Sequence, residues 1–174
     1  MTTSIVLTAG VFDLLHPGHI EHFYESKIKA VRTTTTSTYS YHNSFNPIPD
    51  TVKLLVLLNS DSSIAQLNRK FPPVFNQYER YTMLKNIGLI DDVILFDEPT
   101  PCTALVHVVR AIRATDSFEG RSSRDIFYTK GGDYAEQTIP EQRICKEEEI
   151  SLFFTTPKSN NSSDIYNRIK GHIT

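Results

Sequence analysis

Two histidines three positions apart follow the first apolar run of the chain and form the segment best suited to chemistry. His16 and His19 stand at the start of a stretch with helical character, so their spacing brings both imidazole rings to one side of a helix. The amino end of a helix carries free N–H groups and partial positive charge. Two imidazoles at this place favour a phosphoryl group whose negative charge grows in a transition state.

Small residues surround the two histidines. Ala9 and Gly10 end the apolar run, and the backbone at Gly10, Val11 and Phe12 can approach a phosphate closely. Gly18, between the histidines, removes a side chain that would block access. We therefore expect the histidines to be catalytic and these five small or turn residues to bind the phosphate.

Apolar runs alternate with helical stretches along the whole chain. The pattern predicts strands at residues 4–8, 52–58, 92–96, 126–129 and 150–155, and helices at residues 16–30, 77–87, 103–114 and 162–170, the last ended by Gly171. Apolar runs without alternation are typical of parallel strands covered on both faces. We expect an α/β fold, a Rossmann-like doubly wound sheet of about five parallel strands with helices on both faces and a ligand site at the carboxyl strand ends.

The bulk properties of the chain are those of a single domain. Its 174 residues predict one domain over 1–174, with loop insertions at about 31–51 and 115–125 and a shorter loop at Asn59, Ser60 and Asp61. A net charge of −2 gives no general attraction to nucleic acid. No apolar run approaches the roughly 20 residues of a membrane span, and no signal peptide is evident. We expect a cytoplasmic protein without nucleic-acid or membrane partners.

Four motifs together resemble one known family. Residues 10–19 follow the pattern G-x-F-D-x-x-H-x-G-H, which resembles the signature of the cytidylyltransferase-like nucleotidyltransferases at every fixed position. The segments FDEPTP, KGGDY and TIPE further resemble the D-glycero-β-D-manno-heptose 1-phosphate adenylyltransferases. The resemblance implies an enzyme of nucleotide-sugar biosynthesis. It would transfer a nucleoside monophosphate from ATP or CTP to a sugar phosphate, expected to be heptose 1-phosphate, and release pyrophosphate.

The resemblance also assigns roles to residues beyond the first motif. Arg80 would reach the nucleotide phosphates as a catalytic residue, the alternative being a solvated arginine on a helix surface. Two groups would bind the nucleotide: one after the fourth strand and one at the start of the last helix, where hydroxyls can hold a triphosphate. These residues are Lys130, Gly132, Asp133, Ser162 and Ser163.

The chain departs from this branch at one functional position. The family has Lys-Gly and then Arg before its Pro-Val, where this chain has Asn68, Arg69 and Pro72. The family lysine helps to neutralise the triphosphate. Either Arg69 or Lys70 is therefore expected to take over that role.

A protein-bound metal is not expected. His22 continues the histidine spacing, but we interpret it as a helix-surface residue, and the carboxylate or cysteine partners of a zinc site are missing. The resemblance implies Mg²⁺ only together with ATP or CTP, on the β- and γ-phosphates.

Other functions remain open at this point. A glycerol-phosphate or ethanolamine-phosphate cytidylyltransferase shares the histidine motif, and a nucleotide-binding module with weakened catalysis would explain the replaced lysine. An interaction scaffold would give no reason for a complete phosphate motif. The nucleobase is not readable from the sequence, and a homodimer is expected only because relatives often form one.

Overall fold

A five-stranded sheet forms the centre of the computed structural model, which describes residues 3–34, 48–67, 69, 72–132, 139–156 and 162–173, the last range with side chains for 164–170. The strand order is β3-β2-β1-β4-β5, and every neighbouring pair is parallel. The strands are β1 (Ser4–Gly10), β2 (Val52–Asn59), β3 (Asp92–Phe96), β4 (Ile126–Lys130) and β5 (Ser151–Phe154). The expected Rossmann-like fold is confirmed.

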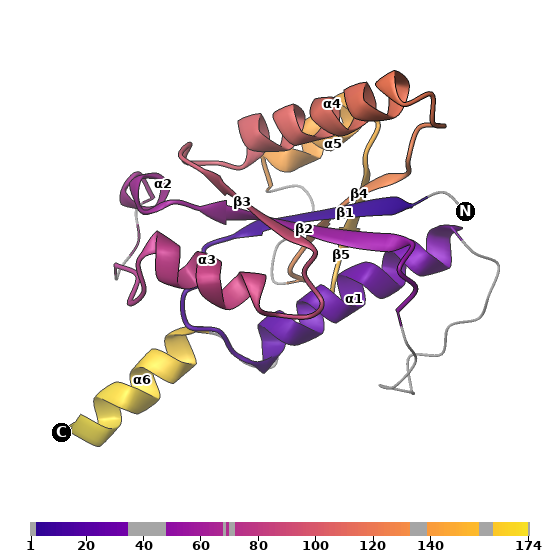
Figure 1. The fold of residues 1–174 in the computed structure, drawn as a ribbon. Coiled ribbons are helices and arrows are strands. Elements are labelled where there is room, and N and C mark those ends of the chain that lie inside the picture. The colour runs from indigo at the N-terminus through magenta and orange to yellow at the C-terminus, as the bar shows by residue number, and fades with distance from the viewer. Residues whose placement is uncertain are drawn as a thin grey trace.

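Helices cover both faces of this sheet. Figure 1 shows α4 and α5 above it and α1 and α3 below it. The helices are α1 (Pro17–Thr34), α2 (Asp61–Ala65), α3 (Gln77–Lys85), α4 (Cys102–Phe118), α5 (Glu141–Glu147) and α6 (Ser162–Ile173). The strand order reverses between β1 and β4, which places the expected ligand crevice at the carboxyl ends of these two strands.

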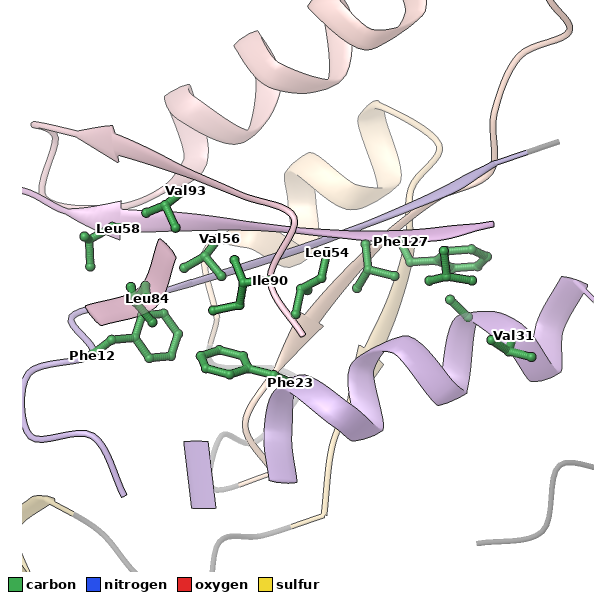
Figure 2. Packing of buried hydrophobic residues seen from close by; sticks show 13 residues of the cluster. Phe12, Phe23, Val31, Leu54, Val56, Leu58, Leu84, Ile90, Val93 and Phe127 are labelled. Atoms are coloured by element: carbon green, nitrogen blue, oxygen red, sulfur yellow. The ribbon is translucent and has the colours of Figure 1, made fainter. Parts of the chain in front are cut away.

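Alternate residues of each strand enter two hydrophobic clusters, one on each face. Val6 of β1 packs in the cluster between the sheet and helices α1 and α3. Ile5 and Leu7 pack in the cluster between the sheet and helices α4 and α5. Figure 2 shows the first cluster, in which Phe12 and Phe23 meet the side chains of β2. Phe12 belongs to the turn after β1, so the core itself holds that turn.

Two helices continue into the expected loop insertions. α1 continues to Thr34 because Val31 is buried in the core, and the hydroxyls of Thr33 and Thr34 donate to carbonyls one turn earlier. α4 continues to Phe118, since Asp116 is buried and pairs with Arg124. The first part of each expected loop insertion is therefore helical, and residues 35–47 lie outside the described residues.

Two short helices are missing from the sequence prediction, and one helix end is wrong. Asn59 is the last residue of β2, and Ser60 caps α2 by accepting from the backbone N–H of Ser63, so the expected loop is a helix start. α5 was not predicted either. α6 continues past Gly171 to Ile173.

Among the described residues, no helix combines the length and the apolar character that crossing a bilayer requires.

Candidate active site at the carboxyl ends of β1 and β4

The turn after β1 has an unusual backbone. Phe12 adopts φ +46°, a left-handed conformation that aromatic residues rarely take. Its ring lies against Gly10, where an added Cβ would stand 3.0 Å from the ring. Glycine at position 10 therefore allows Phe12 to pack back onto the strand end, and the turn exposes the backbone of Val11 to the neighbouring cavities.

Two long-range polar anchors hold this turn in place. The guanidinium of Arg80 donates to the carbonyl oxygens of Val11 at 2.8 Å and Asn59 at 2.7 Å. On the other side of Phe12, the carboxylate of Asp13 accepts from the backbone N–H groups of Val74 and Phe75 at 2.9–3.0 Å. A strained conformation persists only where its surroundings determine it, and these contacts do so.

Arg80 is neither solvated nor among the residues lining the cavities described below. Its side chain is 0% exposed and also donates to Phe75 O and to Asp61 Oδ1. The interpretation as a surface arginine is wrong, because the strand ends supply carbonyl acceptors inside the fold. The expected contact with nucleotide phosphates stays a prediction, whereas the contacts that the structure describes join the ends of β1 and β2.

The two motif histidines lie together, as their spacing predicts. The ring centroids of His16 and His19 are 3.8 Å apart, with 31° between the ring planes. Phe12 meets the ring of His19 edge-on at 5.3 Å. His16 directly precedes α1, and the backbone N–H of His19 donates to His16 O. The first turn of α1 thus fixes both imidazoles beside the turn after β1.

His22 is a correction to the sequence interpretation. It is 4% exposed and not on the helix surface. Its Nε2 lies 2.8 Å from Thr8 Oγ1, and its Nδ1 lies 2.8 Å from Thr155 Oγ1. Thr8 Oγ1 donates to Thr129 O, so it accepts from His22 Nε2. His22 therefore ties α1 to the carboxyl ends of β1, β4 and β5, because the face of α1 that carries it packs on the sheet.

Two adjoining cavities open at these strand ends. The proline cavity, of about 290 Å³, is lined by Pro99, Thr100, Pro101, Asn59, Leu67, Ile139, Pro140 and Glu141. The histidine cavity, of about 200 Å³, is lined by Phe12, Asp13, His19, His22 and Gly131. Both share five further residues: Ala9, Gly10, Val11, Arg69 and Lys130. Two cationic side chains thus stand where the cavities meet.

These two cations differ in their surroundings. Lys130 ends β4, and its Nζ donates to Glu141 Oε1 at 2.6 Å. Arg69 is exposed and, among the residues that the structure describes, has no carboxylate partner. Its backbone N–H donates to Leu67 O. Arg69 is therefore the described cation best placed to meet a ligand without competition, while Lys70 lies outside the described residues.

The other expected binding residues are placed in part. Ala9, Gly10 and Val11 line both cavities, Gly18 is buried in the first turn of α1, and Gly131 lines the histidine cavity beside Gly132. Asp133 and the side chains of Ser162 and Ser163 lie outside the described residues, so their roles stay predictions.

Sequence reasoning missed Glu141 as part of the site. The motif TIPE was noted only as a resemblance, and its glutamate carried no signal for an ion pair with Lys130. Burial together with the carboxylate of Glu141 raises the pKa of Tyr128 well above its usual value, so its hydroxyl remains a donor to Glu141. Burial raises the pKa of the nearby Cys145 thiol to about 12, which excludes a thiolate nucleophile there near neutral pH.

The described residues contain no group of three or more His, Cys, Asp or Glu side chains that could hold a metal ion. The carboxylate of Asp13, which lines the histidine cavity, is already bonded to the backbone of residues 74 and 75.

Curated relatives cover nearly the whole chain. The chain is 29% identical over 167 residues to the bifunctional protein HldE of Wolinella succinogenes. The aligned region covers 96% of this chain and 27% of the relative. The chain is 30% identical over 168 residues to HldE of Campylobacter fetus subsp. fetus, and the aligned region covers 97% of this chain and 28% of that relative. The chain thus spans about a quarter of the length of these relatives. No family model matches it.

A solved structure supports the fold independently. The lipopolysaccharide core biosynthesis protein from Thermoplasma volcanium superimposes with a TM-score of 0.56 at 20% identity, over 91% of this chain and 98% of that one. At this identity the likeness concerns the fold alone. The curated relatives confirm the resemblance that the motifs predicted: this chain resembles the adenylyltransferase-like domain of HldE.

Proposed function

We propose that the protein transfers a nucleoside monophosphate from ATP or CTP to a sugar phosphate, with heptose 1-phosphate as the first candidate, and releases pyrophosphate. The observation that carries the proposal is the close pair of His16 and His19, whose ring centroids are 3.8 Å apart, next to a cavity that His19, Lys130 and Arg69 line. The similarity to HldE supports the nucleotidyltransferase class.

The histidine cavity suits the triphosphate. It combines the imidazole of His19, two cationic side chains and the backbone of the turn after β1. The turn after β1 is held before any ligand arrives by the core packing of Phe12 and by Arg80, and the ammonium of Lys130 is bonded to Glu141. Preorganised donors of this kind stabilise the charge that develops on a phosphoryl group.

The proline cavity suits the phosphorylated acceptor. It adjoins the histidine cavity along Ala9, Gly10 and Val11, and the two cations at their junction can meet anions from both sides. An acceptor phosphate held there would lie next to the α-phosphorus of the nucleotide. The wall of three prolines and Ile139 would pack against the carbon skeleton of the acceptor.

In the proposed reaction, an oxygen of the acceptor phosphate attacks the α-phosphorus of the nucleotide. The bond from that phosphorus to the oxygen bridging to the β-phosphate breaks, and pyrophosphate leaves with the electron pair. A phosphate monoester is already anionic near neutral pH, so no general base is needed. The protein positions both anions and stabilises the transferred group, for which we propose His16 and His19.

Arg69 is proposed to replace the lysine that the adenylyltransferase branch has at this part of the sequence. It lines both cavities and has no described carboxylate partner, whereas Lys130 is paired with Glu141. Mg²⁺ is proposed to enter on the β- and γ-phosphates, where it offsets charge that these few cations leave uncompensated.

A pyrophosphate-release screen tests the proposed function. Four nucleotides are combined with heptose 1-phosphate, glycerol phosphate and ethanolamine phosphate, each with and without Mg²⁺. We expect release with heptose 1-phosphate and ATP or CTP, only in the presence of Mg²⁺. Release with glycerol phosphate or ethanolamine phosphate instead would identify the alternative cytidylyltransferase activity. Nucleotide binding by calorimetry without release from any pair would indicate a binding module and contradict the proposal.

A homodimer remains a separate prediction, which light scattering of the purified protein at several concentrations tests. A mass of one chain, 19.8 kDa, at every concentration would exclude it.

A further inference from the structure

The ion pair between Lys130 and Glu141 joins the cleft to helix α5. Lys130 lines both cavities, and its side chain is 13% exposed. The side chain of Glu141, at the first position of α5, is 1% exposed, and its Oε1 accepts from Lys130 Nζ at 2.6 Å. An exposed lysine side chain samples many rotamers, whereas this one is held at one point by a buried partner.

A second donor fixes the carboxylate itself. The hydroxyl of Tyr128, in the strand that ends with Lys130, donates to the same oxygen of Glu141 at 2.9 Å. Tyr128 is 0% exposed, so bulk water does not compete for its hydroxyl. The other carboxylate oxygen, Oε2, is buried and has no hydrogen-bond partner among the described residues. Among the described residues, the hydroxyl of Tyr128 and the ammonium of Lys130 therefore stabilise this buried carboxylate through Oε1.

This arrangement restrains the position of the Lys130 ammonium. Movement of Lys130 away from Glu141 would leave a buried carboxylate with Tyr128 as its remaining described partner, which is costly in a protein interior. The ammonium is thus kept where the two cavities meet.

We propose that Glu141 is a positioning residue that holds the ammonium of Lys130 at the junction of the two substrates, with Tyr128 fixing the carboxylate. The expected effect of Glu141 on the reaction rate rests on the proposed function. The held lysine itself is a property of the protein without any substrate. Glu141 would not touch either substrate, and its effect would pass through Lys130.

The first experiment asks whether Glu141 holds Lys130, and it uses no nucleotide. The protein is methylated reductively with formaldehyde, and mass spectrometry compares the initial rate at Lys130 with that at the exposed Lys146. In Glu141→Gln we expect this ratio to rise about tenfold, because a charge-assisted hydrogen bond no longer holds the amine. An unchanged ratio would overturn the proposal.

A matched control lies on the same helix. Glu147 pairs with Arg143 at 2.6 Å on the exposed side of α5. Glu147→Gln removes the same charge without touching the cleft, and its labelling ratio should equal that of the unaltered protein. Thermal unfolding is measured for every variant. If Glu141→Gln does not fold, Tyr128→Phe serves instead, and a smaller rise in the same ratio is expected.

The second experiment asks whether the held lysine matters for the reaction. The kcat/KM of pyrophosphate release is measured for Glu141→Gln, Lys130→Met and the double variant. We expect Glu141→Gln to lose about tenfold alone and almost nothing further in the Lys130→Met background. Equal losses in both backgrounds would overturn the positioning role. If the unaltered protein is inactive throughout the screen, the proposed function fails, while the labelling ratio still decides whether Glu141 holds Lys130.

Discussion

The turn after β1 and the end of β4 face the same cleft, but different forces hold them. On the β1 side, the ring of Phe12 packs against Gly10, His19 and the core, and backbone hydrogen bonds from Arg80 fix the chain. On the β4 side, the cationic group of Lys130 donates to the buried carboxylate of Glu141. The first side is thus maintained by packing and backbone geometry, and the second by side-chain electrostatics.

This difference separates the effects that substitutions should have. Changes on the β1 side should alter the backbone of the phosphate site and the stability of the fold together. Changes to the exposed cation Arg69 should alter binding and turnover with smaller effects on stability. The following predictions test that separation, beginning with the largest expected effect.

Arg80→Met should lower the free energy of unfolding by about 3 kcal/mol or more, since three backbone carbonyls and the carboxylate of Asp61 lose a fully buried donor. Urea unfolding followed by circular dichroism measures the loss. Arg143→Met, whose side chain is 82% exposed, is the control and should change stability by less than about 0.5 kcal/mol. Equal stability of the two variants would show that Arg80 does not anchor the turn.

His19→Ala should lower the turnover of the proposed reaction at least about a hundredfold, the scale of removing one preorganised stabilising group. Pyrophosphate release at saturating substrate measures it. His107→Ala, an exposed histidine of α4, is the control and should retain full activity. Full activity of His19→Ala would refute the catalytic assignment, however well the fold survives.

Arg69→Ala should lower kcat/KM about tenfold without a measurable change in thermal stability, because its side chain is exposed and binds no described carboxylate. Arg69→Lys restores the positive charge and should recover most of the loss. Steady-state kinetics at low and moderate salt checks both variants. If Arg69→Ala behaves like the unaltered protein, another cation has replaced the lysine of the adenylyltransferase branch.

The smallest predicted effect is a pH dependence of stability from Tyr128. Burial and the carboxylate of Glu141 raise the pKa of Tyr128 in the folded protein, so the unfolded chain loses this proton first as pH rises. The contribution is complete below pH about 10 and declines above it, by at most about 1.4 kcal/mol per pH unit. Unfolding at pH 8 to 11 should show a shallower decline in Tyr128→Phe. Tyr78→Phe, at an exposed tyrosine, is the control. Equal decline of stability with pH in Tyr128→Phe and Tyr78→Phe would contradict this prediction.

The features that could be predicted before folding are those that depend on residues close together along the chain. The apolar runs located all five strands, and the three-residue spacing of His16 and His19 predicted the meeting of their rings. The motif also predicted the position of the site, because a glycine turn after the first strand lies where the strand order reverses. These inferences need only local periodicity and the geometry of a helix turn.

The burial of polar side chains and the identity of their partners became visible in the folded protein alone. The sequence predicts a helix-surface position for His22 and, for Arg80, either a contact with nucleotide phosphates or a solvated side chain. Both side chains are instead buried and form hydrogen bonds at the carboxyl ends of the strands. The pairing of Lys130 with Glu141 likewise depends on how α5 packs beside β4. Burial and ion pairing arise between residues that folding brings together. Local spacing along the chain therefore cannot predict them.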